Sequence, residues 1–65
     1  MKILIYEHRH KKNITLKQLE HLTGYSKSAL NDWENEKVSP TLLELKAIAQ
    51  ALGVRITDLF DDDYK

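Results

Sequence analysis

The sequence predicts an all-α fold, and two observations lead to that prediction. Apolar residues recur at helical spacing through most of the 65 residues, and no segment shows the strict alternation of a half-buried strand. Residues that commonly end helices, namely Asn13, Gly24 and Gly53, and a loop over residues 36–39 divide the chain into five short helical segments. The length allows one small domain over residues 1–65, and its 42% hydrophobic share is normal for a globular chain.

The first two helices are expected in the N-terminal half. One runs from about Lys2 to Lys12, so that the apolar start of the chain begins a core helix. The next follows Thr15, whose hydroxyl can cap a helix N-terminus, and it ends at Gly24. Its apolar residues follow helical spacing at Leu16, Leu19 and Leu22.

Three further segments complete the predicted bundle. Ser26 is the expected cap of a third helix, in which Leu30 and Trp33 lie three residues apart and share the inward face. Thr41 caps the clearest helix, whose apolar stripe consists of Leu42, Leu45, Ile48, Ala49 and Leu52. The last short turn covers residues 56–60. The bottom of the core is assigned to Val54, Ile56, Leu59 and Phe60. The expected core positions are Leu19, Leu30, Trp33, Leu45, Ile48 and Leu52.

Charge is balanced overall but unevenly distributed. Residues 1–37 hold seven basic and five acidic residues, whereas residues 38–65 hold three basic and five acidic residues. The core is expected within about residues 5–60, followed by an acidic tail over residues 61–65. A phosphate backbone would repel that tail, so it should point away from any nucleic acid.

Several function classes lack their required residues. There is no cysteine, and His8 and His10 are two residues apart, so a helix would point them in different directions. No glycine-rich phosphate loop or Ser-His-Asp arrangement occurs, so we expect no enzyme, no metal, no cofactor and no small-molecule substrate. No apolar run approaches the roughly 18 residues of a membrane span, and we expect a cytoplasmic protein without a membrane partner.

The segment from Thr23 to Asn35, "TGYSKSALNDWEN", carries the main functional signal. A tight turn containing glycine joins two short helices, as in a helix-turn-helix. The start of the second helix would offer hydrogen-bonding groups to base edges in a major groove, namely Lys27, Ser28, Asn31 and Asp32. This spacing alone leaves DNA reading and an ordinary amphipathic surface helix equally open.

A wider pattern distinguishes between these two readings. From about Ile5 to Phe60 the sequence resembles the Cro/C1-type helix-turn-helix family, also called the XRE family. The matching positions are Arg9, Ile14–Leu19, Gly24–Ser28, Trp33–Lys37, Ser39–Thr41, Leu45, Ile48–Val54 and Asp58–Phe60. The resemblance implies a compact five-helix lambda-repressor-like bundle that binds double-stranded DNA.

The resemblance also implies roles for individual residues. DNA base contacts would come from the start of the recognition helix, at Lys27, Ser28, Ala29, Asn31 and Asp32. DNA backbone contacts would come from Thr15, Lys17, Asn35 and Lys37. Arg9 and Glu34 would form a structural salt bridge between the first helix and the recognition helix.

Four positions depart from the family pattern. Leu16 stands where glutamine commonly contacts phosphate, and His8 replaces an aliphatic residue. Glu20 replaces an alanine between the two motif helices, so its carboxylate must find a partner or turn outward. Asp32 replaces a basic or amide residue and would be repelled by phosphate unless it pairs with a neighbour or accepts from a cytosine amino group.

The sequence therefore predicts a sequence-specific transcription regulator, in particular a repressor that acts as a homodimer on a palindromic operator. The dimer interface is expected at the C-terminal turn, Val54–Phe60 with Tyr64, or at the apolar start, Ile3–Tyr6. Two alternatives remain open: a protein-interaction module of the same fold, and the antitoxin of a toxin–antitoxin pair.

Overall fold

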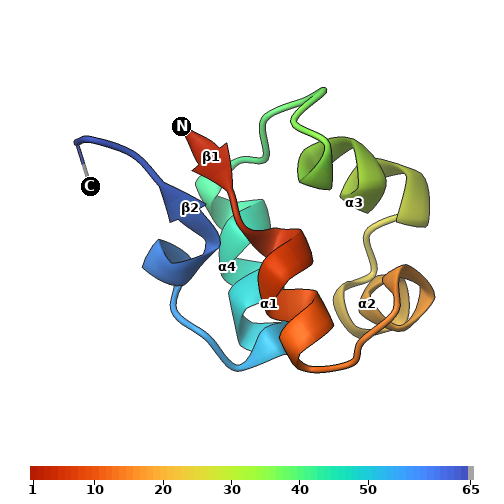
Figure 1. The fold of residues 1–65 in the computed structure, drawn as a ribbon. Helices are drawn as coiled ribbons and strands as arrows, with labels where there is room; N and C mark the ends of the chain where they lie inside the picture. The colour runs from red at the N-terminus through yellow and green to blue at the C-terminus, as the bar shows by residue number, and fades with distance from the viewer. Residues whose placement is uncertain (65) are drawn as a thin grey trace.

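The computed structural model describes residues 1–64, and Figure 1 shows how its elements are arranged. In chain order the elements are β1 (Lys2–Ile3), α1 (Ile5–Lys11), α2 (Leu16–Thr23), α3 (Lys27–Glu34), α4 (Leu42–Leu52), the 3-10 helix η1 (Ile56–Leu59) and β2 (Phe60–Asp61). The prediction of five helices and no strand is wrong. Within the described residues there are four α-helices, one 3-10 turn and a two-stranded sheet.

The sheet joins the two ends of the chain. β1 and β2 are antiparallel, with Lys2 opposite Asp61 and Ile3 opposite Phe60. The Leu4 amide donates to the Leu59 carbonyl at 2.8 Å, which continues the pairing up to the start of α1. The first residues are therefore a strand and not the start of a helix. Strands of two residues are too short to show alternation in a sequence.

Local capping explains where the helices begin and end. The hydroxyl of Thr15 accepts from the Gln18 amide at 3.1 Å, and the Gln18 side chain accepts from the Thr15 amide at 2.8 Å. Thr41 makes the same reciprocal pair of bonds in front of α4. α2 and α4 both end on a glycine in the left-handed conformation, with φ of 81° at Gly24 and 68° at Gly53.

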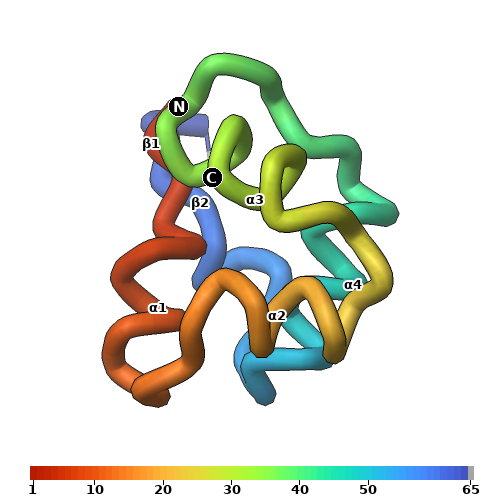
Figure 2. The backbone as a smooth tube through the Cα atoms, turned by 90° about the vertical axis from the view of Figure 1, so that its right-hand side faces the viewer, coloured from red at the N-terminus to blue at the C-terminus, as the bar shows by residue number. Residues whose placement is uncertain are grey.

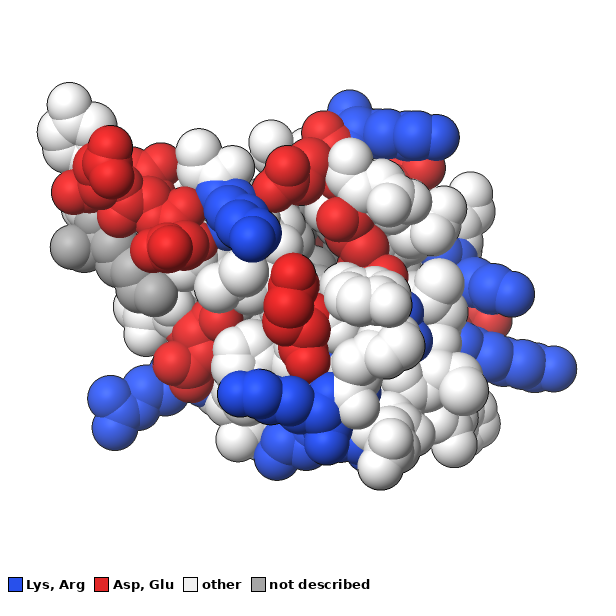
Figure 3. Space-filling view, in the orientation of Figure 1, with Lys and Arg blue, Asp and Glu red and all other residues white. Residues whose placement is uncertain are grey.

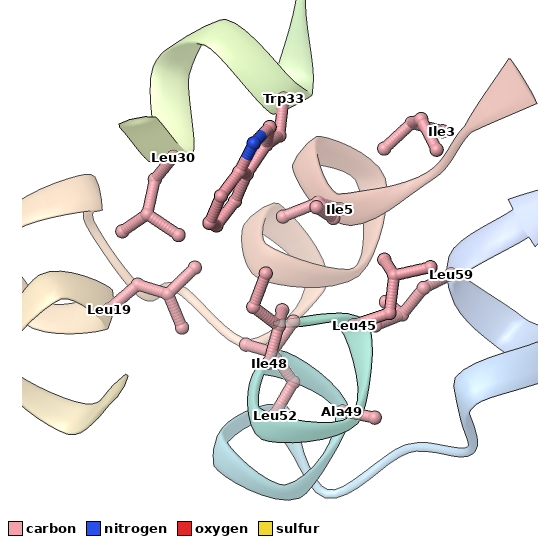
Figure 4. Packing of buried hydrophobic residues seen from close by; sticks show 10 residues of the cluster. All are labelled: Ile3, Ile5, Leu19, Leu30, Trp33, Leu45, Ile48, Ala49, Leu52 and Leu59. Carbon is pink, nitrogen blue, oxygen red and sulfur yellow. The ribbon is translucent and has the colours of Figure 1, made fainter. Parts of the chain in front are cut away.

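The core lies where α1, α2, α3 and α4 meet, and Figure 4 shows side chains from all four helices converging there. Its buried apolar members are Ile3, Ile5, Leu19, Leu30, Trp33, Leu45, Ile48, Ala49, Leu52 and Leu59. Trp33 also meets Tyr25 edge to face, with ring centroids 5.3 Å apart. This core fixes α3 against α1 and α2, so one face of α3 is left for other contacts.

Two leucines of the predicted apolar stripes lie outside the core. Leu22 is 56% exposed and Leu42 is 71% exposed. Leu42 is the first residue of α4, and the buried part of that helix begins only at Leu45. Of the four residues assigned to the bottom of the core, Leu59 is buried. The other three, Val54, Ile56 and Phe60, are partly buried and pack against the core.

Candidate nucleic-acid interface

α2 and α3 are joined by a short turn held by side-chain and backbone bonds. The Gly24 amide donates to the Glu20 carbonyl at 2.8 Å, which ends α2. The Thr23 hydroxyl donates to the Leu19 carbonyl at 2.8 Å and accepts from the Tyr25 amide at 3.2 Å. The chain therefore leaves α2 in a defined direction, and three residues separate the two helices. Figure 2 shows this turn between α2 and α3.

Two side chains cap the N-terminus of α3. The Ser26 hydroxyl accepts from the Ala29 amide at 3.1 Å, and the Glu20 carboxylate accepts from the Lys27 amide at 2.7 Å. Both bonds satisfy amides that have no partner within the helix. Glu20, one of the departures from the family pattern, thus has a structural partner in the Lys27 amide. Its carboxylate nevertheless leaves a negative charge at the N-terminus of α3, the end that would face DNA.

The outward face of α3 carries polar groups. Lys27, Ser28 and Asn31 are exposed, while Asp32 is partly buried. Ala29 is partly buried and packs against the core. No ion pair reaches Asp32 from any of residues 1–64, so its carboxylate is not neutralised by Lys27 or Arg9.

A groove of about 500 Å³ lies beside the start of α3. It is formed by the end of α1, the start of α2 and the start of α3, and its lining consists of Arg9, His10, Asn13, Ile14, Thr15, Leu16, Lys17 and Lys27. The fold thus brings together Thr15, Lys17 and Lys27, which the sequence assigned to DNA contacts.

The sequence did not point to two members of this groove, His10 and Asn13. They belong to the end of α1 and the turn after it, and only the path of the chain from α1 to α2 places them beside Lys17. Asn13 adopts a φ of 55°, a conformation that asparagine tolerates better than most residues. Leu16 is partly buried against the core, so it serves packing at the position where the family commonly has a glutamine.

A buried ion pair joins α1 to α3. The Arg9 guanidinium donates from Nε to Glu34 Oε2 at 2.7 Å and from Nη2 to Glu34 Oε1 at 3.1 Å. Its Nη1 donates to the Ile14 carbonyl at 2.9 Å. Arg9 also lies over the Tyr6 ring, with Cζ 5.4 Å from the centroid. With all these contacts made inside the protein, Arg9 holds α3 in place and has little freedom to bind phosphate.

Asn35 and Lys37 do not belong to the groove. Both are exposed and follow the end of α3, and Asn35 donates from its side chain to that of Asn31 at 3.3 Å. Asn35 instead borders a second hollow that also includes Glu7, Glu34 and Glu36. The four backbone contacts assigned by sequence therefore divide between the two ends of the helix-turn-helix.

Acidic side chains cluster at one end of the molecule. Figure 3 shows acidic side chains gathered over the end where β2 and the termini lie, whereas basic side chains project at several places around this face, with acidic side chains among them on the side of α2 and α3. At the acidic end, bonds from the Tyr64 amide and the Met1 amino group lower the pKa of the Asp62 carboxyl. The acidic cluster would keep this end of the molecule away from a polyanion.

Residues 1–64 can also be described with respect to metal ions and membranes. They contain no group of three or more histidine, cysteine, aspartate or glutamate residues placed to hold a metal ion. No helix in the same part of the chain has the length and apolar character needed to cross a membrane.

α2 and α3 are two short helices joined by a tight turn. The second helix is capped, buries one face and exposes a polar one. This arrangement is a helix-turn-helix of the kind that enters a DNA groove. The family model described as helix-turn-helix matches residues 5–59. The chain therefore belongs to the Cro/C1-type helix-turn-helix family, or XRE family, of DNA-binding transcription regulators. A search of the curated proteins gave no match.

Proposed function

We propose that the protein is a sequence-specific repressor that binds a palindromic DNA operator as a homodimer and blocks access of the transcription machinery. The observation that carries this proposal is the position of Lys27 and Ser28. They stand at the capped, exposed start of α3 and next to a groove that contains Lys17. Base-reading and phosphate-binding groups are therefore adjacent, as docking in a major groove requires.

The roles divide according to position. In this proposal Lys27, Ser28, Asn31 and Asp32 read bases, while Thr15 and Lys17 hold phosphate from the start of α2. Lys37 and Asn35 hold phosphate beyond the other end of α3. One domain of this size contacts few base pairs, so two copies about one helical turn apart would double the sequence that is read.

One observation favours a second candidate function, a protein-interaction module of the same fold. The carboxylates of Glu20 and Asp32 lie on the surface that would face DNA, and the chain has no net positive charge. Both carboxylates would oppose a phosphate backbone, whereas a basic protein surface would accept them.

Selection of bound duplexes from a random DNA pool at two salt concentrations tests the proposal. The expected result is an enriched palindromic motif whose enrichment fades as salt rises. The logarithm of the binding constant should fall against the logarithm of the salt concentration with a slope of about −0.9 per phosphate contacted. Folded protein that enriches no sequence at low salt would overturn DNA reading and favour the interaction module. An enriched single half-site would support DNA reading and overturn the palindromic operator.

A further inference from the structure

A hollow of about 630 Å³ lies between α2 and the turn that precedes it. It is lined by residues 12–14 and by Lys17, Gln18, His21 and Leu22 of α2, and we call it the α2 hollow. In Figure 1 the chain between α1 and α2 runs along the bottom of the molecule, away from both termini. Residues 13, 14 and 17 also line the groove beside α3, so the two concave surfaces are neighbours.

The walls of the α2 hollow are held by bonds within the protein. The Ile14 amide donates to the Arg9 carbonyl at 3.1 Å, and the Ile14 carbonyl accepts from Arg9 Nη1 at 2.9 Å. On the other wall, the side chain of Gln18 accepts from the Thr15 amide at 2.8 Å. The turn and the first part of α2 are therefore fixed before any partner binds.

Apolar and basic groups meet in this hollow. Leu22 is 56% exposed, and Ile14 is partly buried beside it in the lining. Lys12 and Lys17 are exposed and add two ammonium groups, His21 adds a ring N–H donor, and none of the lining residues is acidic. An apolar centre with a polar rim is typical of protein interfaces, and a rim with this charge selects carboxylates.

The shape of the hollow favours a protein segment over a small molecule. Sites for small molecules enclose most of the ligand surface, whereas the four α2 residues that line this hollow are all exposed. A protein segment can place one side chain in the hollow and make its remaining contacts outside it. A phosphate backbone would satisfy the lysines but has no aliphatic group to cover Leu22.

The chain's own acidic tail does not supply these carboxylates. Asp61 pairs with Lys2 in the sheet, and the Asp62 carboxylate lies 3.4 Å from the amino group of Met1. Both contacts keep the tail beside β1, at the end of the molecule away from the α2 hollow (Figure 1). The carboxylates must therefore come from another molecule.

We propose that the α2 hollow binds an acidic segment of another protein, in which carboxylates flank a large aliphatic side chain. The aliphatic side chain covers Leu22, and the carboxylates pair with Lys12 and Lys17. Because Lys17 is also assigned to DNA phosphate, the bound segment competes with DNA. This competition rests on the proposed function, whereas binding of the segment does not.

The test uses a short capped peptide with one central leucine flanked on both sides by glutamates. One control peptide replaces the glutamates by glutamines, and the other replaces the leucine by serine and keeps the charge. Leu22→Gln and Lys12→Gln alter the hollow, while Leu43→Gln and Lys46→Gln make the same changes at exposed positions of α4. Thermal unfolding checks that all four variants are folded.

Peptide binding is measured first, without DNA, from the shifts of backbone amide resonances. We expect shifts centred on residues 12–22 and a dissociation constant on the order of 1 mM, because the contact is small. Each hollow variant should bind the peptide about threefold or more weakly, and the α4 variants should bind it as wild type does. Both control peptides should bind wild type more weakly than the first peptide does.

Three results would overturn the proposal. Shifts spread over lysines outside the hollow, or unchanged affinity in Leu22→Gln, would mean that charge alone attracts the peptide. Shifts of residues 12–22 that grow with protein concentration in the absence of peptide would make a second copy of this chain the occupant. Equal shifts of the Leu22 amide with a random DNA duplex would make the hollow part of the DNA site.

Competition is measured next, by fluorescence anisotropy with the selected operator. The leucine peptide should weaken DNA binding by wild type more than the serine peptide does, although both carry the same charge and contribute equally to ionic strength. Leu22→Gln should remove this difference, and equal effects of the two peptides on wild type would overturn the competition. If the protein bound no DNA, the proposed function would fail, while the amide shifts would still decide whether the hollow binds an acidic segment.

Discussion

The guanidinium of Arg9 and the carboxylate of Glu34 form two hydrogen bonds, 2.7 and 3.1 Å long, between α1 and the end of α3. Their side chains are only 9% and 5% exposed. Because Arg9 also donates to the Ile14 carbonyl, one side chain ties together α1, the loop before α2 and the recognition helix. The relative position of the groove and α3 therefore depends on this pair.

Removal of one partner should destabilise the domain strongly. In Glu34→Ala, Arg9 keeps its charge in a buried position without its carboxylate, and we expect a loss of about 3–5 kcal/mol in the free energy of unfolding. That is comparable to the whole stability of a domain this small. Urea unfolding followed by the fluorescence of Trp33, the single tryptophan, measures the loss.

A double variant separates the ion pair from packing. Arg9→Met/Glu34→Leu removes both charges together and should recover most of the stability lost in Glu34→Ala. If Glu34→Ala unfolded at the same urea concentration as wild type, the pair would contribute little to the positioning of α3.

Much of the fold is predictable from sequence because its determinants are local. Thr15 with Gln18 and Thr41 with Glu44 are three residues apart, and each pair makes its reciprocal cap whatever the rest of the chain does. Leu30 and Trp33 share one face of α3 through helical geometry alone, and both are buried.

Features that depend on distant parts of the chain could not be predicted in this way. Ile3 and Phe60 pair across almost the whole sequence, and a strand of two residues has no periodicity to reveal it. The bond from the Lys27 amide to Glu20 likewise exists only because α2 and α3 pack together. At the site, the spacing along α3 indicates which of its residues point outward. His10 joins the groove only because α1 packs close to α2 and α3, and the sequence does not reveal that packing.

The ends of the chain should loosen in acid. The amide of Tyr64 and the amino group of Met1 lower the pKa of Asp62, so this carboxylate stabilises the folded state when it is ionised. That contribution is present above the unfolded-state pKa of about 3.9 and is lost as the pH falls through the lower folded-state value. The Tyr64 amide resonance should therefore titrate with a midpoint below the ordinary pKa of an aspartate. In Asp62→Asn this transition should disappear, and an ordinary midpoint in wild type would show that the two bonds are not formed in solution.

Two lysines should have distinguishable effects on DNA binding. Lys37→Ala should weaken binding to every sequence about equally and reduce the slope of log K against log salt by about 0.9, because a phosphate contact carries no base information. Lys27→Ala should weaken the selected operator more than random DNA. Fluorescence anisotropy with both duplexes at several salt concentrations measures these quantities. Equal losses on the two duplexes for Lys27→Ala would remove this lysine from the base-reading group.

Glu20→Gln should strengthen DNA binding. The amide oxygen of glutamine can still accept from the Lys27 amide, but the negative charge at the start of α3 is gone. A charge near phosphate opposes binding by about 1 kcal/mol in a largely solvated setting, so we expect roughly a fivefold gain in affinity. The lost interaction with the helix N-terminus should lower stability by about 0.3–1 kcal/mol. Asp61→Asn, which also replaces an exposed carboxylate by an amide but lies in β2 at the acidic end, is the control and should give a smaller gain.

Asp32→Asn should change which base is preferred, since Asp32 has no ion-pair partner within residues 1–64 and its carboxylate can only accept hydrogen bonds. A cytosine offers an amino donor to such a group, whereas an asparagine both donates and accepts and so matches adenine. We therefore expect the variant to exchange cytosine for adenine at one position of each half-site, with about 1–3 kcal/mol of discrimination.

Repeating the DNA selection with this variant tests the exchange. Asp63→Asn removes one negative charge from the acidic tail and controls for the change in net charge. Tighter binding by Asp32→Asn with an unchanged motif would mean that Asp32 only repels the backbone, and base reading would then rest on Lys27, Ser28 and Asn31. A changed motif would instead place the second turn of α3 against base edges, because a carboxylate that contacts only phosphate or solvent cannot alter the selected sequence.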